Sequence, residues 1–473
     1  MTADDPAHPA DSAVHALAQP VGTLDVWAGC THTVTRAEAA VLASPPFMRT
    51  RRLRQMGLAF HAWPNAENTR ASHSLGVAYW AATSLDALRH NGDPATRAAI
   101  AQVTSALHPL SLDVVLRLFG LLHDIDLLPL GHTLRYQSGL FAEAPGHPRL
   151  AACAGSIRAH AAEHAFGEAP TEADRRSWFD AFSRHLDAAI DDRGPHARLA
   201  VELVNSGLGA DLIDFALRDS FAITRPQRLH TDLPAGLRLV DTDGGPGLAL
   251  DVSDPATATA RVEMADDLYR ARFEVFAASV YHPVKLAADA MLDLTLRLLG
   301  AEECRAILPE DLLIEIGDDE LLDRLATAET GPGLAGALLG GRLHEEVWRT
   351  EDLDAFRRHP DAARALALDP TWRDDTEHAL RDALPWAATG DVIVAVSAPT
   401  MQAKPANARF AGHPDTGVFT LADAAGHGFT TTAAETAARY PALWSLRVYL
   451  APRWRSRAGE AAKAAAAVLG DGS

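Results

Sequence analysis

The chain has 473 residues, of which 48% are hydrophobic and 22% charged, a composition that supports a packed core and is atypical of a disordered protein. Its formal net charge of −19 argues against a non-specific nucleic-acid binder, because phosphate backbones require a basic surface. A site for a small phosphate compound needs only a metal ion or a few cations. Three lysines stand against forty arginines, so phosphate contacts should come mainly from Arg.

The three cysteines, Cys30, Cys153 and Cys304, are widely spaced and form no CxxC pair. A disulfide framework or a cysteine zinc site is therefore not expected. The first twenty residues are acidic and polar, without the basic start and apolar run of a signal peptide. No run of 18 apolar residues predicts a spanning helix. We expect a cytoplasmic protein that does not bind membranes.

We expect residues 1–30 to form a mobile N-terminal tail and residues 31–300 to form a mostly helical domain. The helical segments carry apolar residues at three- and four-residue spacing. These segments include AEAAVLA, HSLGVAYWAATSLDALRH, SLDVVLRLFGLLHD and KLAADAMLDLTLRLL. Pro45-Pro46 and Gly92 punctuate the pattern and predict element boundaries there.

Residues 301–385 are predicted to continue as a helical extension of short acidic helices, including PEDLLIEIGDDELLDRL. Residues 386–473 differ, because DVIVAVSAP (391–399) and LWSLRVYLAP (443–452) are typical of strands. The segment AETAARYPALW between these strands and AGEAAKAAAAVLG after them favour helices. The pattern predicts a mainly α fold, a helical bundle followed by a smaller α+β C-terminal region.

The segment FGLLHDIDLLPLGHT (119–133) places His123 and Asp124 side by side after an apolar helical run. An imidazole nitrogen next to a carboxylate suits a divalent metal of intermediate softness. The dipeptide alone is also consistent with a solvated helix end. Upstream lies TRASHSLGVAYW with His73, and downstream lies LGADLIDFALRDS with Asp211. A helical bundle can bring such residues together from separate helices, although His73 could instead be a capping or core histidine.

This order of residues resembles the HD-domain metal phosphohydrolases. Within them, four segments resemble the deoxynucleoside triphosphate triphosphohydrolases, a family that includes the bacterial dGTPases and the vertebrate SAM-and-HD-domain dNTPase. The segments occur in family order over about half of the chain. They are PPFMRTRRLRQMGLAFHAWPNAENTRASHSLGVAYW (45–80), HDIDLLPLGHT (123–133), ADLIDFALRDS (210–220) and ASVYHPVKLAADAM (278–291). The resemblance implies an HD-domain helical bundle for residues 31–300.

The resemblance implies a metal site formed by His73, His123, Asp124 and Asp211, in which Asp124 also takes part in catalysis. Mixed imidazole and carboxylate ligands suit a divalent ion such as Mn, Fe, Co or Zn, or Mg, better than Ca. Arg70 and His132 match residues that face the substrate phosphates. Arg70 could equally be a solvated arginine, and His132 a buried histidine bonded to the backbone.

The resemblance also implies contacts to the nucleoside. Gln55 matches a sugar-contacting Gln, and Asp219 matches an acid near the sugar 3′-hydroxyl, although Asp219 could equally pair with Arg218 or another Arg. Phe215 stands where the family has a Tyr that packs on the sugar, and could be ordinary core. His282 matches a nucleotide-contacting His, with the same alternative.

The general acid of the family is a mobile His after the HD helix, and His147 in GLFAEAPGHPRL (139–150) lies at a suitable distance along the chain. Pro148 follows it where the family has Glu, and a loop histidine can simply be solvated; His132 is then the next candidate.

Three further positions depart from the family, with Leu127, Leu212 and Val280 replacing a His, a Lys and a Tyr. These departures leave open a substrate with fewer phosphates or a modified sugar.

The expected function is that of a metal-dependent (deoxy)nucleoside triphosphate triphosphohydrolase. Water would attack the α-phosphate of a dNTP and release the (deoxy)nucleoside and tripolyphosphate. The alternatives are another HD phosphohydrolase, such as a nucleotidase or phosphodiesterase, or a nucleotide-sensing protein without turnover. Because the relatives assemble as dimers or higher oligomers with effector nucleotides at subunit contacts, we expect a homo-oligomer and an allosteric nucleotide by analogy.

Overall fold

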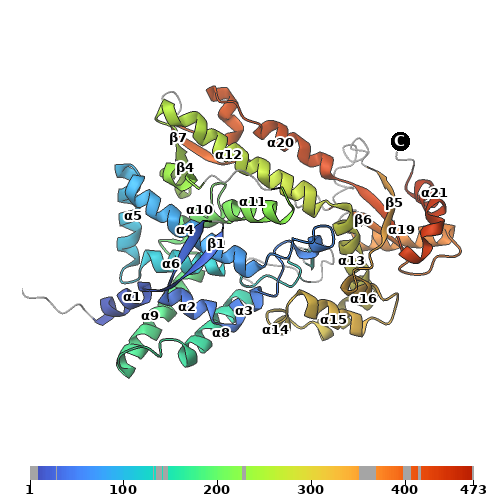
Figure 1. The fold of residues 1–473 in the computed structure, drawn as a ribbon, viewed down its shortest axis with the longest axis horizontal. Helices are drawn as coiled ribbons and strands as arrows, with labels where there is room; N and C mark the ends of the chain where they lie inside the picture. Colours follow the sequence, from blue (N-terminus) through green and yellow to red (C-terminus); the bar gives the residue numbers. More distant parts are fainter. Residues whose placement is uncertain are drawn as a thin grey trace, which may run out of the picture.

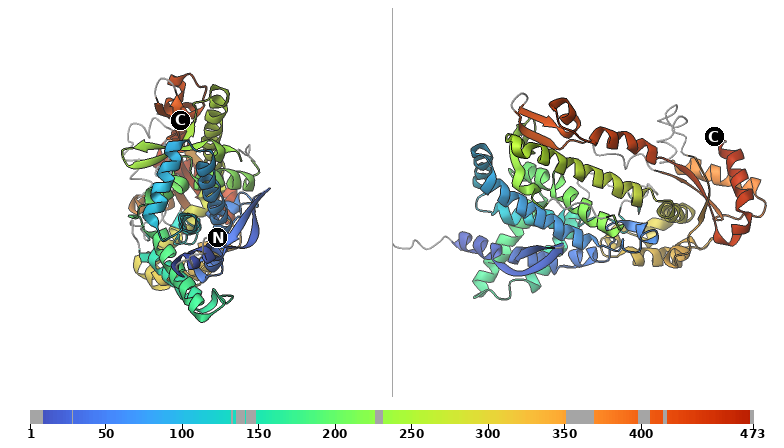
Figure 2. Two further views of the ribbon diagram at one scale, coloured as in Figure 1. Left: turned by 90° about the vertical axis from the view of Figure 1, so that its left-hand side faces the viewer. Right: turned by 45° about the horizontal axis from the view of Figure 1, so that its top comes forward.

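The protein is mainly α-helical, with a smaller α+β region near its C-terminus, as the sequence predicts (Figure 1). The computed structural model describes residues 9–27, 29–131, 133–134, 141, 148–225, 231–350, 369–397, 406–413 and 417–470. The long helices fill one end of the molecule, and the C-terminal sheet with its two helices forms the other end (Figure 2).

The centre of the helical region is α4 (Arg70–Asn91), which packs against both α6 (Leu112–Leu122) and α11 (Ala210–Ala222). Helix α4 begins where the Thr69 hydroxyl accepts a hydrogen bond from the Ser72 N–H, and its C-cap is Gly92. A Cβ on Gly120 would lie 2.9 Å from the Ala78 Cα, so α6 approaches α4 more closely than any side chain would permit. These three helices carry the residues of the predicted metal site.

The surrounding helices bury their apolar faces on this centre and form one large hydrophobic core. They are α1 (Pro9–Ala18), α2 (Arg36–Leu42), α3 (Pro45–Thr50), α5 (Pro94–Leu107), α8 (Pro148–His164), α9 (Glu172–Ile190), α10 (Ala197–Asn205) and α12 (Pro255–Val275).

The expected mobile tail over residues 1–30 is wrong for the part that the structure describes. Residues 9–27 form α1 and the strand β1 (Pro20–Trp27), which pairs antiparallel with β2 (Cys30–Thr35). Leu17 is 0% exposed because α1 packs on α9 and contributes to the main core. A short apolar helix within a polar sequence gives little signal of its own; its burial depends on the partner helix.

A second hydrophobic core lies beside the first and is built around α13 (Pro283–Ile307). It includes the short acidic helices that the sequence predicts for the extension, α14 (Glu310–Leu313) and α15 (Asp318–Ala328), together with α16 (Leu334–Leu339). Leu128 and Leu130, which follow His123 and Asp124, are buried in this core and not in the main one. The segment after the predicted metal ligands is therefore packed against the extension.

The strands form a four-stranded and a three-stranded sheet in addition to the β1–β2 pair. The first has the order β3 (Leu237–Thr242), β4 (Gly245–Asp251), β7 (Arg409–His413), β8 (Gly417–Thr420). The second has the order β5 (Glu345–Thr350), β9 (Leu446–Leu450), β6 (Val392–Val396) and carries α19 (Pro370–Ala383) and α21 (Ala458–Leu469).

The C-terminal strands divide between two parts of the molecule. The predicted strands at 391–399 and 443–452 are confirmed as β6 and β9. In contrast, β7 pairs parallel with β4 of the helical region, and α20 (Ala433–Arg439) packs on α12. The expected boundary at residue 386 therefore does not separate two self-contained regions.

No single helix of the described residues is both long and apolar enough to cross a membrane. Helices α5 and α6 reach that apolar length only together, and they are bent by 88° at the break between them.

Glu38 provides a first prediction about stability. It is buried in a capping box with Thr35, accepts a hydrogen bond from His32 at 2.7 Å and lies 3.3 Å from Arg117. Burial acts to raise its pKa, but His32 and Arg117 hold the pKa of Glu38 below its ordinary value of 4.5. A carboxyl with a lowered folded-state pKa adds stability above its unfolded pKa and loses it as pH falls through the folded value.

We therefore expect Glu38→Gln to lower the free energy of unfolding by about 2 kcal/mol at pH 7, the usual contribution of a charge-assisted hydrogen bond. The difference from wild type should shrink as the pH falls below 4.5. Denaturant titrations of both proteins from pH 7 to pH 3 measure this difference, and a pH-independent difference would contradict the assignment.

Candidate metal centre

His73 lies in the first turn of α4 and is 1% exposed. Its Nδ1 is 2.8 Å from Asp214 Oδ2, and because a carboxylate only accepts, Nδ1 carries the proton. Nε2 is buried without a hydrogen bond and lies 3.2 Å from Asp211 Oδ1, a position where a proton or a metal ion on this nitrogen would be stabilised. A metal-ligating histidine typically has its second nitrogen bonded to a carboxylate in this way.

His123 repeats this arrangement at the C-cap of α6. Its Nδ1 is 2.8 Å from the Gly120 carbonyl oxygen and must donate to it. Its Nε2 is buried without a hydrogen bond. The His73 and His123 rings lie 5.2 Å apart, so two acceptor nitrogens face one small space. Two buried acceptors without donors are unfavourable unless a proton or a cation lies between them.

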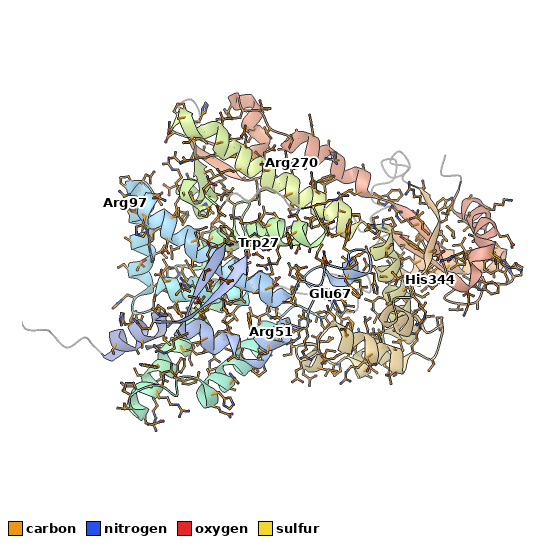
Figure 3. All side chains as sticks on the ribbon, in the orientation of Figure 1. Trp27, Arg51, Glu67, Arg97, Arg270 and His344 are labelled. Carbon is orange, nitrogen blue, oxygen red and sulfur yellow. The ribbon has the colours of Figure 1, made fainter. Side chains whose placement is uncertain are left out.

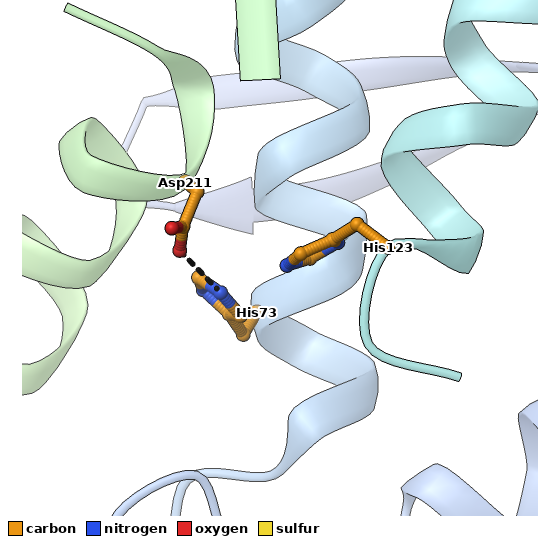
Figure 4. Close-up of side chains that lie close together, drawn as sticks. All are labelled: His73, His123 and Asp211. Atoms are coloured by element: carbon orange, nitrogen blue, oxygen red, sulfur yellow. Dashed lines mark ion pairs between the residues drawn. The ribbon is translucent and has the colours of Figure 1, made fainter. Parts of the chain in front are cut away.

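Asp211 completes the group from the first turn of α11 (Figure 4). One ligand atom each of His73, His123 and Asp211 lies within 4.8 Å of the others. Burial opposes protonation of His73, but Asp211 and Asp214 raise its pKa to about 10, so Nε2 holds a proton at neutral pH unless a metal ion replaces it. Two imidazoles and a carboxylate are a donor set that a divalent transition metal prefers, and these residues fit such an ion.

Asp124 lies beside this group but has its own partner. Its Oδ2 accepts a hydrogen bond from Arg70 Nη1 at 2.6 Å and is 3.5 Å from His123 Nε2. Burial acts to raise the pKa of Asp124, but the charges of His123 and Arg70 lower it below its ordinary value. The structure thus brings all four predicted ligands together, three in a tight group and Asp124 at its edge in an ion pair.

The segment from Asp124 to Gly131 has an unusual backbone. Leu130 and Gly131 are both left-handed, with φ of 58° and 54°. For Leu130 this conformation costs about 1–2 kcal/mol, which the surrounding contacts must offset. A Cβ on Gly131 would be 2.8 Å from Arg70 Nη2, so glycine leaves room for the guanidinium that pairs with Asp124.

A cavity of about 220 Å³ opens next to the group. Six of the predicted site residues line it, and they come from three segments of the chain, 45–80, 123–133 and 210–220. They are Gln55, Arg70, Asp124, Asp211, Phe215 and Asp219. His282 is not among the described residues of the lining. Its Nδ1 accepts from the Val284 N–H at 3.2 Å at the start of α13, and its ring packs on Trp63. His132 and His147 lie outside the described residues, so their roles stay predictions.

The predicted sugar-binding residues line the cavity with different partners. Asp219 is buried and accepts a hydrogen bond from Asn68 Nδ2 at 2.7 Å, and burial raises its pKa to about 6. The alternative pairing with Arg218 is wrong, because both bonds of that guanidinium to a carboxylate go to Asp214. Phe215 packs on Phe276.

The Oε1 of Gln55 is buried without a hydrogen bond, so it can accept one from a ligand in the cavity.

Two cations of the lining were not identified from the sequence. Arg272 of α12 stacks on Phe276, and Lys285 of α13 contacts Asp289 and lies 3.2 Å from Thr133 Oγ1. Lys285 could have been identified from the sequence, because it is one of three lysines and lies within the segment 278–291. Arg272 had none, because α12 carries several arginines and only the fold shows which one faces the cavity.

Asp214 is a third residue that the sequence reading missed as a functional group. It bonds His73 and receives both Nε and Nη2 of Arg218 at 2.8 Å. Arg218 also donates to the Val26 carbonyl, and its guanidinium lies over the ring of Trp27 in the β1–β2 hairpin. Trp27 is labelled in Figure 3. The chain therefore supports the metal centre from its N-terminal hairpin as well.

Comparison with known proteins gives no function. A comparison with models of protein families finds no match. The chain is 25% identical over 257 residues to an uncharacterized protein of Methanocaldococcus jannaschii, covering 54% of this chain and 45% of the archaeal protein, less than half of its length. The crystal structure of a hypothetical protein from Aquifex aeolicus aligns with a TM-score of 0.56 and 15% identity over 93% of this chain and 99% of that one. This likeness shows a shared fold.

Gly76 generates a prediction about the support of His73. A Cβ at this position of α4 would lie 1.8 Å from Asp214 Oδ1. Replacing a helix-interior Gly by Ala usually stabilises a protein by up to about 1 kcal/mol. Here we expect Gly76→Ala to lower the melting temperature and weaken metal binding, because Asp214 must leave His73. The matched control is Gly155→Ala in α8, where a Cβ meets nothing within 4 Å. Equal effects of the two changes would exclude the proposed contact.

The histidine ligands generate a second prediction. The purified protein should contain one divalent transition metal per chain, and His123→Ala should lose it, with affinity falling at least 10-fold. His185 offers a control, since it is fully buried but both of its ring nitrogens are hydrogen-bonded to the backbone. Elemental analysis of wild type, His123→Ala and His185→Ala measures the result. Equal metal content in the two variants would refute the site.

Proposed function

We propose that the protein is an HD-type, metal-dependent phosphohydrolase that converts a (deoxy)nucleoside triphosphate into a (deoxy)nucleoside and tripolyphosphate. One observation carries the proposal. The orphaned nitrogens of His73 and His123 meet the Asp211 carboxylate next to a cavity that also presents three cations, Arg70, Arg272 and Lys285. A metal site and three cationic side chains in one cavity suit a substrate with several adjacent phosphates.

The groups at the metal end have distinct roles in this proposal. When bound, a divalent ion supplies a Lewis acid next to the scissile phosphate. Arg70 neutralises charge that develops on the phosphate oxygens, and Asp124 holds its guanidinium in position. Asp214 keeps His73 in the tautomer that ligates. Arg272 and Lys285 provide two further cations for the remaining phosphates, which offsets the departures at Leu127 and Leu212.

Other residues of the lining suit a nucleoside. The Phe215 ring offers a flat apolar surface for the sugar. The Asp219 carboxylate and Gln55 Oε1 are buried acceptors that a sugar hydroxyl can satisfy. The leaving 5′-oxygen must take up a proton, and His147 or His132 remains the predicted donor. We also propose a cytoplasmic homo-oligomer with an effector nucleotide, which light scattering with and without nucleotides would test.

The proposal predicts which bond breaks. Incubation with a panel of (deoxy)nucleotides and Mn²⁺, Mg²⁺, Co²⁺ or Fe²⁺ should yield nucleoside and tripolyphosphate, separated by chromatography. In ¹⁸O-labelled water the label should enter the polyphosphate and be absent from the nucleoside 5′-hydroxyl, because water attacks the α-phosphorus. A nucleotidase would release orthophosphate from a monophosphate, and a pyrophosphohydrolase would leave a nucleoside monophosphate. Either result would refute the triphosphohydrolase, and binding without turnover would indicate a sensor.

The same assay tests the cationic lining with a matched pair on one helix. Arg272→Met should raise KM for the triphosphate by roughly 10-fold, as expected for loss of one charged hydrogen bond. Arg270→Met should leave KM unchanged, since Arg270 lies outside the described lining and contacts Asp267. Identical KM values for both variants would remove Arg272 from the phosphate site.

A further inference from the structure

Arg49 of α3 is 1% exposed and donates hydrogen bonds to four backbone carbonyls. Two belong to the segment directly after Asp124, with Nη2 2.6 Å from the Leu127 oxygen and Nη1 3.4 Å from the Ile125 oxygen. The other two belong to the end of α14 and to the loop that leads to α15, with Nη2 2.8 Å from the Leu313 oxygen and Nε 3.0 Å from the Ile316 oxygen. One guanidinium therefore joins two segments separated by almost 190 residues.

Asp318, at the start of α15, acts on the same segment from its other end. Its buried carboxylate accepts from the Leu130 N–H at 2.6 Å and from the Arg54 N–H at 2.8 Å. The Leu130 amide is the one that enters the left-handed turn described above. The Arg49 guanidinium thus binds the Ile125 and Leu127 carbonyls, and the Asp318 carboxylate binds the Leu130 amide.

The positive charge of Arg49 is buried, which is unusual for a charged side chain. Among the described residues, no carboxylate forms an ion pair with it within 4.0 Å; carbonyl oxygens satisfy it instead. Burial lowers the pKa of Arg49 to about 10, so it remains a cation at neutral pH. A buried charge without an ion pair contributes less to stability than a well-packed apolar side chain, whereas five donors in a rigid plane fix the geometry of several acceptors at once.

We propose that Arg49 and Asp318 are positioning residues that clamp residues 125–130 to the extension and so hold Asp124 at the metal centre. The inference rests on the proposed metal-dependent function. It makes residues 313–318, outside the four segments that resemble the HD family, a structural part of the site. Neither residue is among those lining the cavity, so both act through the backbone and not on the substrate.

A backbone measurement tests the clamp independently of the metal. In hydrogen–deuterium exchange, Arg49→Met should increase exchange at least 10-fold in peptides that cover residues 125–131. The amides of α4 and α6 should stay protected. The matched control is Arg373→Met, which removes another buried arginine, one that bonds Asp293 between α19 and α13. It should lower the melting temperature without changing exchange at 125–131.

A ligand measurement then tests the consequence for the site. Titration with Mn²⁺, followed by the loss of the free-ion EPR signal, should show about 10- to 100-fold weaker binding for Arg49→Met and wild-type binding for Arg373→Met. Arg49→Lys should be intermediate. Millimolar guanidinium should restore affinity to a smaller variant, Arg49→Ala, because it can refill the same carbonyl cage. If Arg49→Met does not fold, Asp318→Asn provides the same two readouts at the amide end.

The outcomes separate the two proposals. Unchanged exchange at 125–131 in folded Arg49→Met overturns the clamp, as does an equal rise in Arg373→Met. Faster exchange together with unchanged Mn²⁺ affinity overturns its role at the metal site. If wild type binds no divalent metal while Arg49→Met still exchanges faster, the clamp of the backbone stands and the proposed metal centre fails.

Discussion

The hydrogen bond from His73 Nδ1 to Asp214 decides which nitrogen of the imidazole faces Asp211 and His123, and the rest of the candidate centre depends on that choice. With Nδ1 occupied, Nε2 must find a partner near Asp211 and His123. The bond itself exists because Gly76 leaves space for the carboxylate. A glycine in the middle of a 22-residue helix is costly for the helix, and here it permits a contact that no other residue would allow.

The candidate site gathers three cations beside its three carboxylates, in a chain that is strongly acidic overall. A protein of net charge −19 concentrates Arg70, Arg272 and Lys285 around one cavity. Two of these already have an acidic partner, Asp124 and Asp289 respectively, which limits mutual repulsion when no anion is bound. A phosphate ligand of the kind proposed above would have to compete with carboxylates for these cations, and this competition would favour ligands with several charges over those with one.

Much of this architecture could be predicted from the sequence because the signals were local. Apolar spacing identified α4, α6 and α13, and a composition rich in Val identified β6. The His-Asp dipeptide and its companions identified four residues that the fold brings together. The remaining parts depend on long-range contacts. Leu17 became core only through α9, and Arg272 was one arginine among several. Arg49 in an Arg-rich segment gave no sign that its partners would be carbonyls near residues 125 and 316.

The parallel pairing of β4 with β7 constrains the order in which parts of this protein can fold during synthesis. Ala249 and Leu250 align with Arg409 and Phe410, so about 160 residues must be synthesised before that edge of β4 is covered. During translation the helical core can assemble while β4 still presents unpaired amides and carbonyls to the cell. A ribosome that stalls within this interval leaves an open strand edge on an otherwise folded core, a chain suited to chaperone capture or to pairing with a second nascent copy.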